Sequence, residues 1–182
     1  MYWAASCGGC EIAVLNIHEG ILDVDANFDV VFWPVAMDAK YKDVEAMEDG
    51  YITLCLFNGG IRNEENEEMA RLLRRKSKVL VAFGSCACEG GIPGLANLYS
   101  TKSLLDTVYS TVSTDNPRQI RPQPTYKVPE GDIRIPRMEE SLRTLGQVVP
   151  VDYYMPGCPP ESPQIAAVVG LIIQALKGEA QL

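Results

Sequence analysis

The chain has 182 residues, of which 47% are hydrophobic and 22% charged, and this length and composition predict one soluble domain with an apolar core. Its formal net charge of −8 argues against nucleic acid as the main partner, because phosphate binding favours a basic surface. The first residues carry neither a basic segment nor a twin-arginine pair, and the longest apolar stretch, 165–173, is too short to span a bilayer. We therefore expect a cytoplasmic protein without direct membrane insertion.

Apolar, β-branched runs alternate along the chain with helical patterns. The runs predict strands at residues 2–5, 28–33, 51–57, 79–83 and 148–154. Helices are predicted at residues 11–22, 64–76 and 163–177. In the first helix the expected apolar positions are Ile12, Leu15, Ile17 and Leu22. Asn63 is the expected N-cap of the second helix, which starts with acidic and ends with basic residues, and Ser162 is the expected cap of the third.

Strands this apolar indicate a parallel sheet that is covered on both faces. The alternation of strand and helix predicts an α/β fold with a flavodoxin-like, doubly wound parallel sheet. We expect residues 1–182 to form a single domain.

Residues 110–137 depart from this pattern. The segment is rich in proline and has little periodicity, and it carries several cations of an otherwise acidic chain: Arg118, Arg121, Lys127 and Arg134. One interpretation is a long Pro-rich surface loop within the domain. The other is an arm that orders against a partner subunit.

Four cysteines lie just beyond the carboxyl ends of predicted strands. Cys7 and Cys10 follow the first strand in Ser-Cys-Gly-Gly-Cys-Glu, and Cys86 follows the fourth, directly after Gly84 and Ser85. Cys158 follows the fifth strand in Pro-Gly-Cys-Pro-Pro. Ligands of open α/β sheets bind at the carboxyl edge of the strands, so we expect the four thiols to converge there.

Four converging thiolates suit either an iron–sulfur cluster or zinc. The expected helix N-termini after Cys10 and Cys158 direct N–H groups at anionic sulfur. A structural zinc site more often pairs two Cys-x-x-Cys knuckles, whereas this chain has one. Glycines beside the cysteines let the backbone approach a bulky inorganic core: Gly8, Gly9, Gly84, Gly90, Gly91 and Gly157. The sequence thus favours the cluster.

These cysteine motifs, in this order and spacing, resemble the proximal-cluster domain of [NiFe]-hydrogenase small subunits over nearly the whole chain. Residues 58–65, Asn-Gly-Gly-Ile-Arg-Asn-Glu-Glu, and residues 91–94, Gly-Ile-Pro-Gly, are most similar to the cytoplasmic, cofactor-coupled hydrogenases of the NAD(P)-, ferredoxin- or F420-non-reducing type. The resemblance implies one [4Fe–4S] cluster bound by Cys7, Cys10, Cys86 and Cys158. Medial and distal clusters need further cysteines, and only Cys55 and Cys88 are left over here.

The resemblance also implies an electron-transfer subunit of a hydrogenase whose H2-activating site is on another chain. The family builds the NiFe centre on two Cys-x-x-Cys pairs, and the single pair of this chain serves its own cluster. The expected partners are a NiFe-bearing large subunit and electron-transfer subunits that reduce NAD(P) or ferredoxin. These iron–sulfur or flavin subunits would carry the flavin and the further clusters.

Three alternatives remain open. The first is the cluster-bearing subunit of a complex-I-like quinone reductase, which shares the Pro-Gly-Cys-Pro element. Such subunits have a tandem Cys-Cys in the first loop, which Cys7-Gly8-Gly9-Cys10 does not match. An FMN-binding flavodoxin would need a Ser/Thr-rich phosphate loop after the first strand. A zinc scaffold would be colourless, whereas a cluster gives a brown protein.

Several other residues have two interpretations. Glu11 is either a favoured first-turn carboxylate or, by the resemblance, a proton relay or an interface hydrogen bond. Cys55 is expected to be a buried free thiol, and Cys88 either a buried thiol or an exchange ligand. His18, the only histidine, is expected at the surface or an interface. Apolar residues expected near the cysteine loops, where a partner would cover them, are Trp3, Trp33, Pro34, Ile92 and Pro93.

Overall fold

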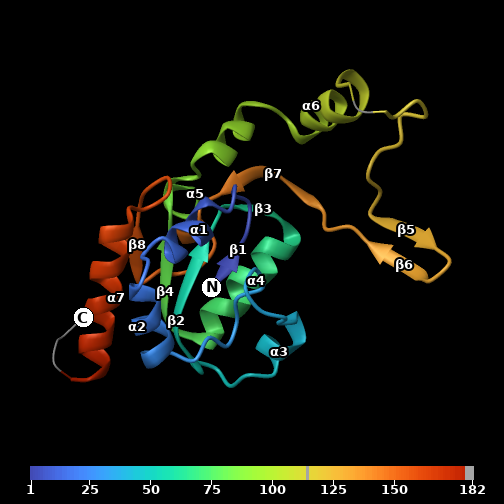
Figure 1. Cartoon of the computed structure of the whole chain (residues 1–182). Coiled ribbons are helices and arrows are strands. Elements are labelled where there is room, and N and C mark those ends of the chain that lie inside the picture. Colours follow the sequence, from blue (N-terminus) through green and yellow to red (C-terminus); the bar gives the residue numbers. More distant parts are fainter. Residues whose placement is uncertain (114, 179–182) are drawn as a thin grey trace.

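The computed structural model describes residues 1–113 and 115–178. At its centre lies a four-stranded parallel sheet (Figure 1). The strand order is β1 (Tyr2–Trp3), β2 (Ile52–Asn58), β4 (Ser77–Phe83) and β8 (Tyr153–Met155). The carboxyl ends of parallel strands meet at one edge of a sheet. The expected α/β class and parallel sheet are confirmed.

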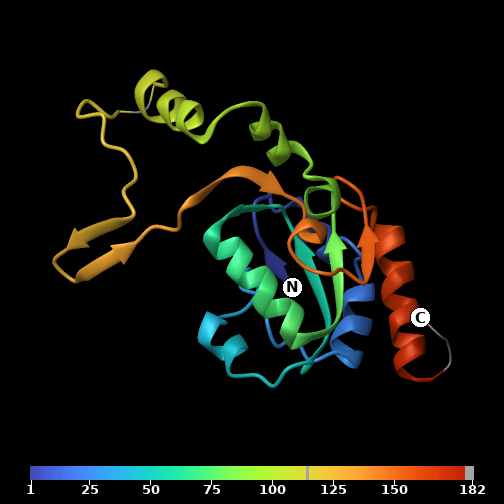
Figure 2. The ribbon, with the colours of Figure 1, turned by 180° about the vertical axis from the view of Figure 1, so that it is seen from behind.

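Helices cover both faces of the sheet (Figure 2). One face packs against α1 (Gly9–Leu15), α2 (Gly20–Asn27) and α7 (Ser162–Leu176). The other face packs against α3 (Tyr41–Glu45), α4 (Glu64–Lys76) and α5 (Ser85–Glu89). Alternate side chains of β4 pack into both cores. Leu80 and Ala82 lie in the core on the α4 side, and Val81 and Phe83 lie in the core on the α1 side. The doubly wound arrangement is therefore confirmed.

Helix α4 begins where the sequence predicts. The side chain of Asn63 accepts a hydrogen bond from the backbone N–H of Asn66 at 2.8 Å. Acidic residues in the first turn and basic residues in the last fit the helix dipole. The predicted helix and its cap are confirmed.

The first predicted helix is wrong as one continuous element. Helix α1 ends at Leu15 and α2 begins at Gly20, because His18 between them has a φ of 55°, which an α-helix does not accommodate. The helix therefore turns different residues to the sheet than expected. Of the four predicted apolar positions only Ile17 is buried, and the buried residues of α1 are Cys10, Glu11, Ala13 and Val14.

The strand predicted at residues 28–33 is also absent from the described structure. Strand β1 has only two residues and pairs with β2, whereas the contacts of this N-terminal segment with residues 28–33 include a hydrogen bond from the Met1 amino group to the Phe32 carbonyl and a stacked pair of rings, Tyr2 and Phe32. Val31 and Phe32 pack in the core on the α4 side, and Trp33 packs on the α1 side. Residues 28–33 thus occupy the place of an edge strand without its hydrogen bonds.

Two further boundaries need correction. Strand β8 covers only the end of the predicted 148–154 strand, because the preceding chain turns in the 3-10 helix η3 (Leu145–Gln147) and then packs Val148 and Val149 into the core. Helix α7 begins at Ser162, but its N-cap is Glu161 and no side chain caps it. In the part of the chain that the structure describes, no helix is long and apolar enough to cross a membrane.

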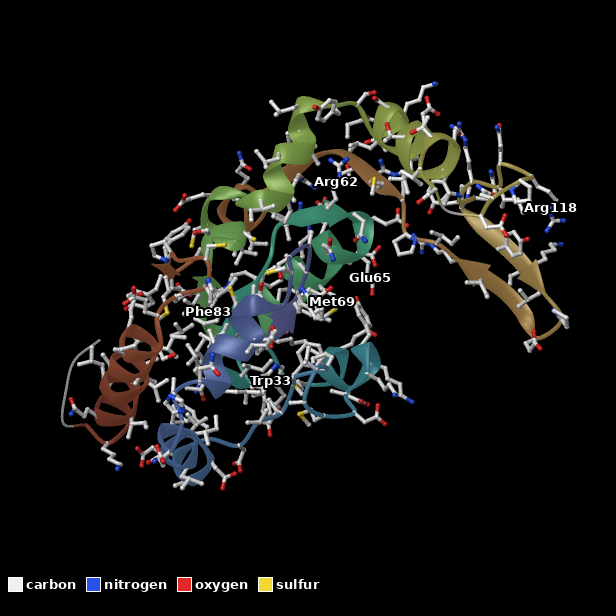
Figure 3. The ribbon with its side chains drawn as sticks, turned by 45° about the horizontal axis from the view of Figure 1, so that its top comes forward. Trp33, Arg62, Glu65, Met69, Phe83 and Arg118 are labelled. Carbon is white, nitrogen blue, oxygen red and sulfur yellow. The ribbon has the colours of Figure 1, made fainter. Side chains whose placement is uncertain are left out.

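An arm, defined here as residues 99–137, projects from the sheet (Figure 1). The chain enters it through η1 (Ile92–Leu98) and returns through β7 (Met138–Arg143), which pairs antiparallel with β3 (Ile61–Asn63). Within the arm lie α6 (Thr101–Asp106), η2 (Thr107–Thr111) and the hairpin of β5 (Thr125–Val128) and β6 (Gly131–Arg134). Arg118 lies far from the sheet (Figure 3). The Pro-rich segment forms the outer part of this arm.

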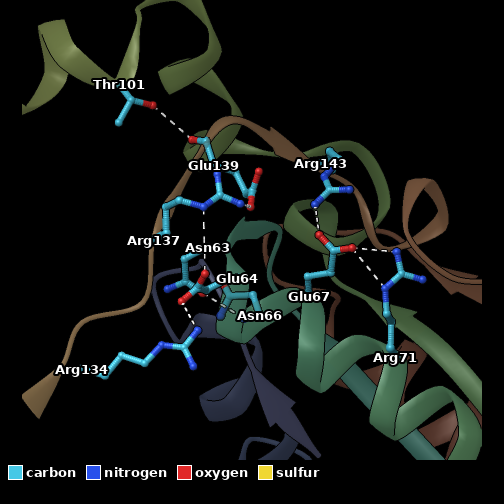
Figure 4. A network of polar contacts seen from close by, with 10 residues as sticks. All are labelled: Asn63, Glu64, Asn66, Glu67, Arg71, Thr101, Arg134, Arg137, Glu139 and Arg143. Atoms are coloured by element: carbon cyan, nitrogen blue, oxygen red, sulfur yellow. Dashed lines mark hydrogen bonds and ion pairs between the residues drawn. The ribbon is translucent and has the colours of Figure 1, made fainter. Parts of the chain in front are cut away.

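Polar contacts fix the arm at its base (Figure 4). Glu64 on α4 accepts from Arg134 at 2.6 Å and lies 4.0 Å from Arg137. The hydroxyl of Thr101 donates to the backbone carbonyl of Glu139 at 3.1 Å. These contacts hold the two ends of the arm against α4 and β7.

Candidate metal-cluster site

Three segments at the carboxyl edge of the sheet carry the four predicted ligand cysteines, with Cys10 in the first turn of α1 and Cys86 in the first turn of α5. They follow β1, β4 and β8. The loops after β4 and β8 are joined by backbone hydrogen bonds, from Gly84 N–H to the Met155 carbonyl at 2.8 Å and from Ser85 N–H to the Gly157 carbonyl at 2.7 Å. The Ser85 hydroxyl accepts a third bond from Gly157 N–H at 3.2 Å. Cys86 and Cys158 are therefore held on connected backbone.

Glycines make room for the sulfur atoms. A Cβ on Gly84 would lie 2.3 Å from Cys10 Sγ, and one on Gly91 would lie 2.9 Å from Cys86 Sγ. Both residues also have positive φ angles, of 84° and 51°. The short distance at Gly84 shows that Cys10 packs directly against the segment that follows β4.

The thiols influence one another electrostatically. Burial, followed by the charges of Cys86, Cys7 and Cys158, raises the pKa of Cys10 to about 12. Burial and the charges of Cys158 and Cys7 raise the pKa of Cys86. A cationic metal core would have the opposite effect, because it would stabilise the thiolates.

The four thiols suit a metal cluster. Within residues 1–113 and 115–178, no three His, Cys, Asp or Glu side chains are grouped tightly enough to hold one metal ion. In a [4Fe–4S] cluster each thiolate binds a different iron, so the sulfur atoms surround a volume and do not meet at one point. Four free thiols around a glycine-lined edge suit such a group.

The loop between Cys7 and Cys10 is held by a buried polar network. The Ser6 hydroxyl donates to Asn58 Oδ1 at 2.8 Å, and Asn58 Nδ2 donates to Glu11 Oε1 at 3.0 Å. The indole N–H of Trp33 donates to the other carboxylate oxygen, Glu11 Oε2. Asn58 is 0% and Glu11 3% exposed. Glu11 thus lies beside the cysteine loop, in the first turn of α1, with both oxygens engaged.

The two remaining cysteines lie in the core on the α4 side of the sheet. Cys55 is buried in β2, and burial raises its pKa. The Cys88 thiol donates to the Ala82 carbonyl at 3.3 Å, and burial, followed by the charge of Glu89, raises its pKa to about 11. Cys55 is therefore a buried thiol, whereas Cys88 is partly buried.

Sequence analysis overlooked the roles of Ser6, Asn58 and Trp33 in this network. A signal was present for Asn58, because it is the polar last residue of an otherwise apolar strand and so falls at the ligand-binding edge. No periodicity could have paired Trp33 with Glu11.

A family model described as the 20 kDa subunit of NADH ubiquinone oxidoreductase matches residues 7–172. The chain therefore belongs to this family. The matched range includes all four cysteines at the carboxyl edge.

Individual relatives narrow the resemblance. The chain is 43% identical to the iron–sulfur subunit of the F420-non-reducing hydrogenase of Archaeoglobus profundus, over 92% of this chain and 53% of the relative. It is 39% identical to a subunit of the F420-non-reducing hydrogenase vhu of Methanocaldococcus jannaschii, over 98% and 56%. It is 26% identical to the delta subunit of the NAD-reducing hydrogenase HoxS of Cupriavidus necator, over 90% and 72%. The chain thus spans about half the length of the first two relatives.

Solved structures agree. A chain of the NAD+-reducing [NiFe]-hydrogenase in the H2-reduced state superimposes with a TM-score of 0.80 at 29% identity, over 95% of this chain and 88% of that one. A [NiFeSe] hydrogenase of Desulfovibrio vulgaris matches with a TM-score of 0.59 at 18% identity, over 97% of this chain and 59% of that one, which shows a shared fold alone. The predicted resemblance to [NiFe]-hydrogenase small subunits is confirmed.

Proposed function

We propose that the chain binds one [4Fe–4S] cluster through Cys7, Cys10, Cys86 and Cys158 and serves as the electron-transfer small subunit of a [NiFe] hydrogenase. The observation that carries the proposal is the meeting of three cysteine segments at one glycine-lined edge, where Cys10 Sγ lies against Gly84 and Cys86 Sγ lies against Gly91. The bound cluster would supply a one-electron carrier. The chain's own residues hold the thiols and connect the loops.

A partner subunit is needed for the chemistry. The chain has one Cys-x-x-Cys pair, which its own cluster would use, so the H2-activating NiFe centre belongs to a large subunit. Electrons would leave toward iron–sulfur or flavin subunits that reduce NAD(P) or ferredoxin. The hydrogenase names of the relatives support this assignment.

The edge around the cysteines suits burial by such a subunit. Ile92, which follows the Cys86 loop, is 69% exposed, and Leu95 and Leu98 on the same 3-10 helix are exposed as well. Trp3, at the end of β1, is 43% exposed with its ring against Gly8. Exposed apolar groups concentrated in one place favour a protein interface. The large subunit would cover this surface.

Ligation is tested by anaerobic reconstitution of the full chain. Wild-type protein should take up about four iron atoms and give the EPR signal of a reduced [4Fe–4S] cluster. Changing any of Cys7, Cys10, Cys86 or Cys158 to Ala should abolish or convert that signal, whereas the core variant Cys55→Ala should keep it. An unchanged spectrum in Cys158→Ala would refute the ligand set.

The partner is tested by co-purification from cells that express the native complex. A nickel-containing chain should accompany this subunit, and the complex should reduce a viologen dye with H2. The description of the matching family favours a second candidate, the corresponding subunit of a quinone reductase. A nickel-free complex that reduces quinone with NADH would establish that candidate instead.

A further inference from the structure

One side chain touches both ends of the Cys7–Cys10 loop. Asn58 accepts from Ser6, the residue before Cys7, and donates to Glu11, the residue after Cys10. Its carboxamide therefore spans the loop from outside. The Ser6 hydroxyl extends this network into the Cys7–Cys10 loop, because it also accepts from the backbone N–H of Gly8 at 3.4 Å.

Asn58 itself has almost no freedom. It is fully buried at the end of β2, where it lies opposite Trp3 of β1 on one side and Phe83 of β4 on the other. Its backbone carbonyl accepts from Ala4 N–H at 2.8 Å. A group fixed in the central sheet thus sets the position of the loop beyond the edge.

The carboxylate of Glu11 is equally constrained. One oxygen accepts from Asn58 and the other from the Trp33 indole, so each has a fixed neutral donor. No cation contacts Glu11 among the hydrogen bonds and ion pairs of the described residues. These contacts suit a carboxylate that is held in place as an acceptor at the start of α1, the helix that carries Cys10.

We propose that Asn58 is a positioning residue that fixes the separation of Cys7 and Cys10 through its simultaneous contacts with Ser6 and Glu11. The inference rests on the proposed cluster ligation. Groups that orient metal ligands typically change metal affinity by roughly tenfold to a hundredfold when they are removed. Asn58 would act on the cluster without touching it.

The test compares Asn58→Ala with Asn97→Ala in the full, anaerobically reconstituted chain. Asn97 is the matched control, because its amide also makes two bonds between segments, with the Leu142 carbonyl at 2.9 Å and Leu142 N–H at 2.7 Å, away from the Cys7–Cys10 loop. In Asn58→Ala the cluster should be lost to a chelator roughly tenfold or more faster than in wild type, and its EPR g-values should shift. Asn97→Ala should leave both unchanged.

A milder variant covers the case in which Asn58→Ala does not fold. Ser6→Ala removes the contact of Asn58 before Cys7, together with the bond that the Ser6 hydroxyl accepts from Gly8 N–H, and should accelerate cluster loss in the same direction. Wild-type lifetime and g-values in folded Asn58→Ala, or in Ser6→Ala if the former is unfolded, would overturn the inference while leaving the ligand set intact. A wild-type chain that binds no cluster would overturn both.

Discussion

Between Ile52 and Phe83 the backbone is fixed by burial, whereas in the arm it is fixed by polar contacts at a few points. Phe57 and Phe83 are fully buried in two cores on opposite faces of the sheet. Tyr126 and Ile133, directly opposite each other in the arm's hairpin, are about half exposed, at 49% and 51%. Ion pairs therefore hold the arm at its base, but its hairpin has no hydrophobic core of its own.

The hairpin is nevertheless two-sided. In its register Tyr126 and Val128 share a face with Ile133, and Lys127 and Asp132 lie on the other. An isolated two-stranded hairpin is marginally stable in water. We therefore expect the arm to open locally at a free energy well below that of global unfolding.

The largest effect should come from the sheet. Phe57→Ala removes a fully buried ring from the core on the α4 side, and we expect the free energy of unfolding to fall by about 3–5 kcal/mol. Chemical denaturation of the cluster-free chain, followed by circular dichroism, measures this. A loss below about 1 kcal/mol would mean that the sheet is no better packed than the arm.

An intermediate effect is expected at the edge of the sheet. Gly84→Ala forces a Cβ to within 2.3 Å of Cys10 Sγ at a positive φ, which should destabilise the fold by about 1–3 kcal/mol and displace Cys10. Gly94→Ala is the control, since its Cβ would meet nothing within 4 Å. Denaturation and the rate of thiol labelling report the two consequences. Equal behaviour of both variants would contradict the close approach of the loops.

A local effect is expected at the base of the arm. The hydrogen bond from Arg134 lowers the pKa of Glu64 below its ordinary value of 4.5. The contact is therefore complete above that value and is lost as the pH falls through the lowered pKa. NMR resonances of β5 and β6 should shift in that acid range and stay constant near neutrality. In Glu64→Gln the part of this shift that comes from the contact with Arg134 should disappear, and amide exchange in the hairpin should be faster at about pH 7.

The smallest effect is expected on the hairpin itself. Ile133→Ser replaces a half-exposed residue with no core beneath it, so the free energy of unfolding should change by no more than about 0.5 kcal/mol. The same denaturation experiment as for Phe57→Ala makes the comparison direct. A loss of several kcal/mol would show that the arm contributes to the global fold.

Local patterns predicted the elements that local chemistry determines. Asn63 and the charged ends of α4 indicate that helix, and the apolar runs of β2 and β4 indicate the buried strands. The break at His18, where φ is 55°, and the missing ladder at residues 28–33 depend on tertiary geometry. Sequence spacing alone could not reveal either.

The site divides in the same way. Topology could bring four cysteines at strand ends to one edge, and there the structure places Cys10 against Gly84 and Cys86 against Gly91. The contact of Trp33 with Glu11 joins residues from separate segments through side-chain direction, which no motif encodes. The contacts that hold the Cys7–Cys10 loop were therefore less predictable than the cysteines that it carries.

The uneven exposure of the four cysteines has a practical consequence for handling the empty chain. Cys7 and Cys158 are exposed, whereas Cys10 and Cys86 are buried. Oxygen and peroxide would therefore reach the outer pair first and convert those thiols toward sulfenic and sulfinic acids. Neither outer side chain belongs to a core, so the damaged chain would still fold and melt normally. Under the ligation proposed above, aerobically purified material would look folded and yet take up no iron.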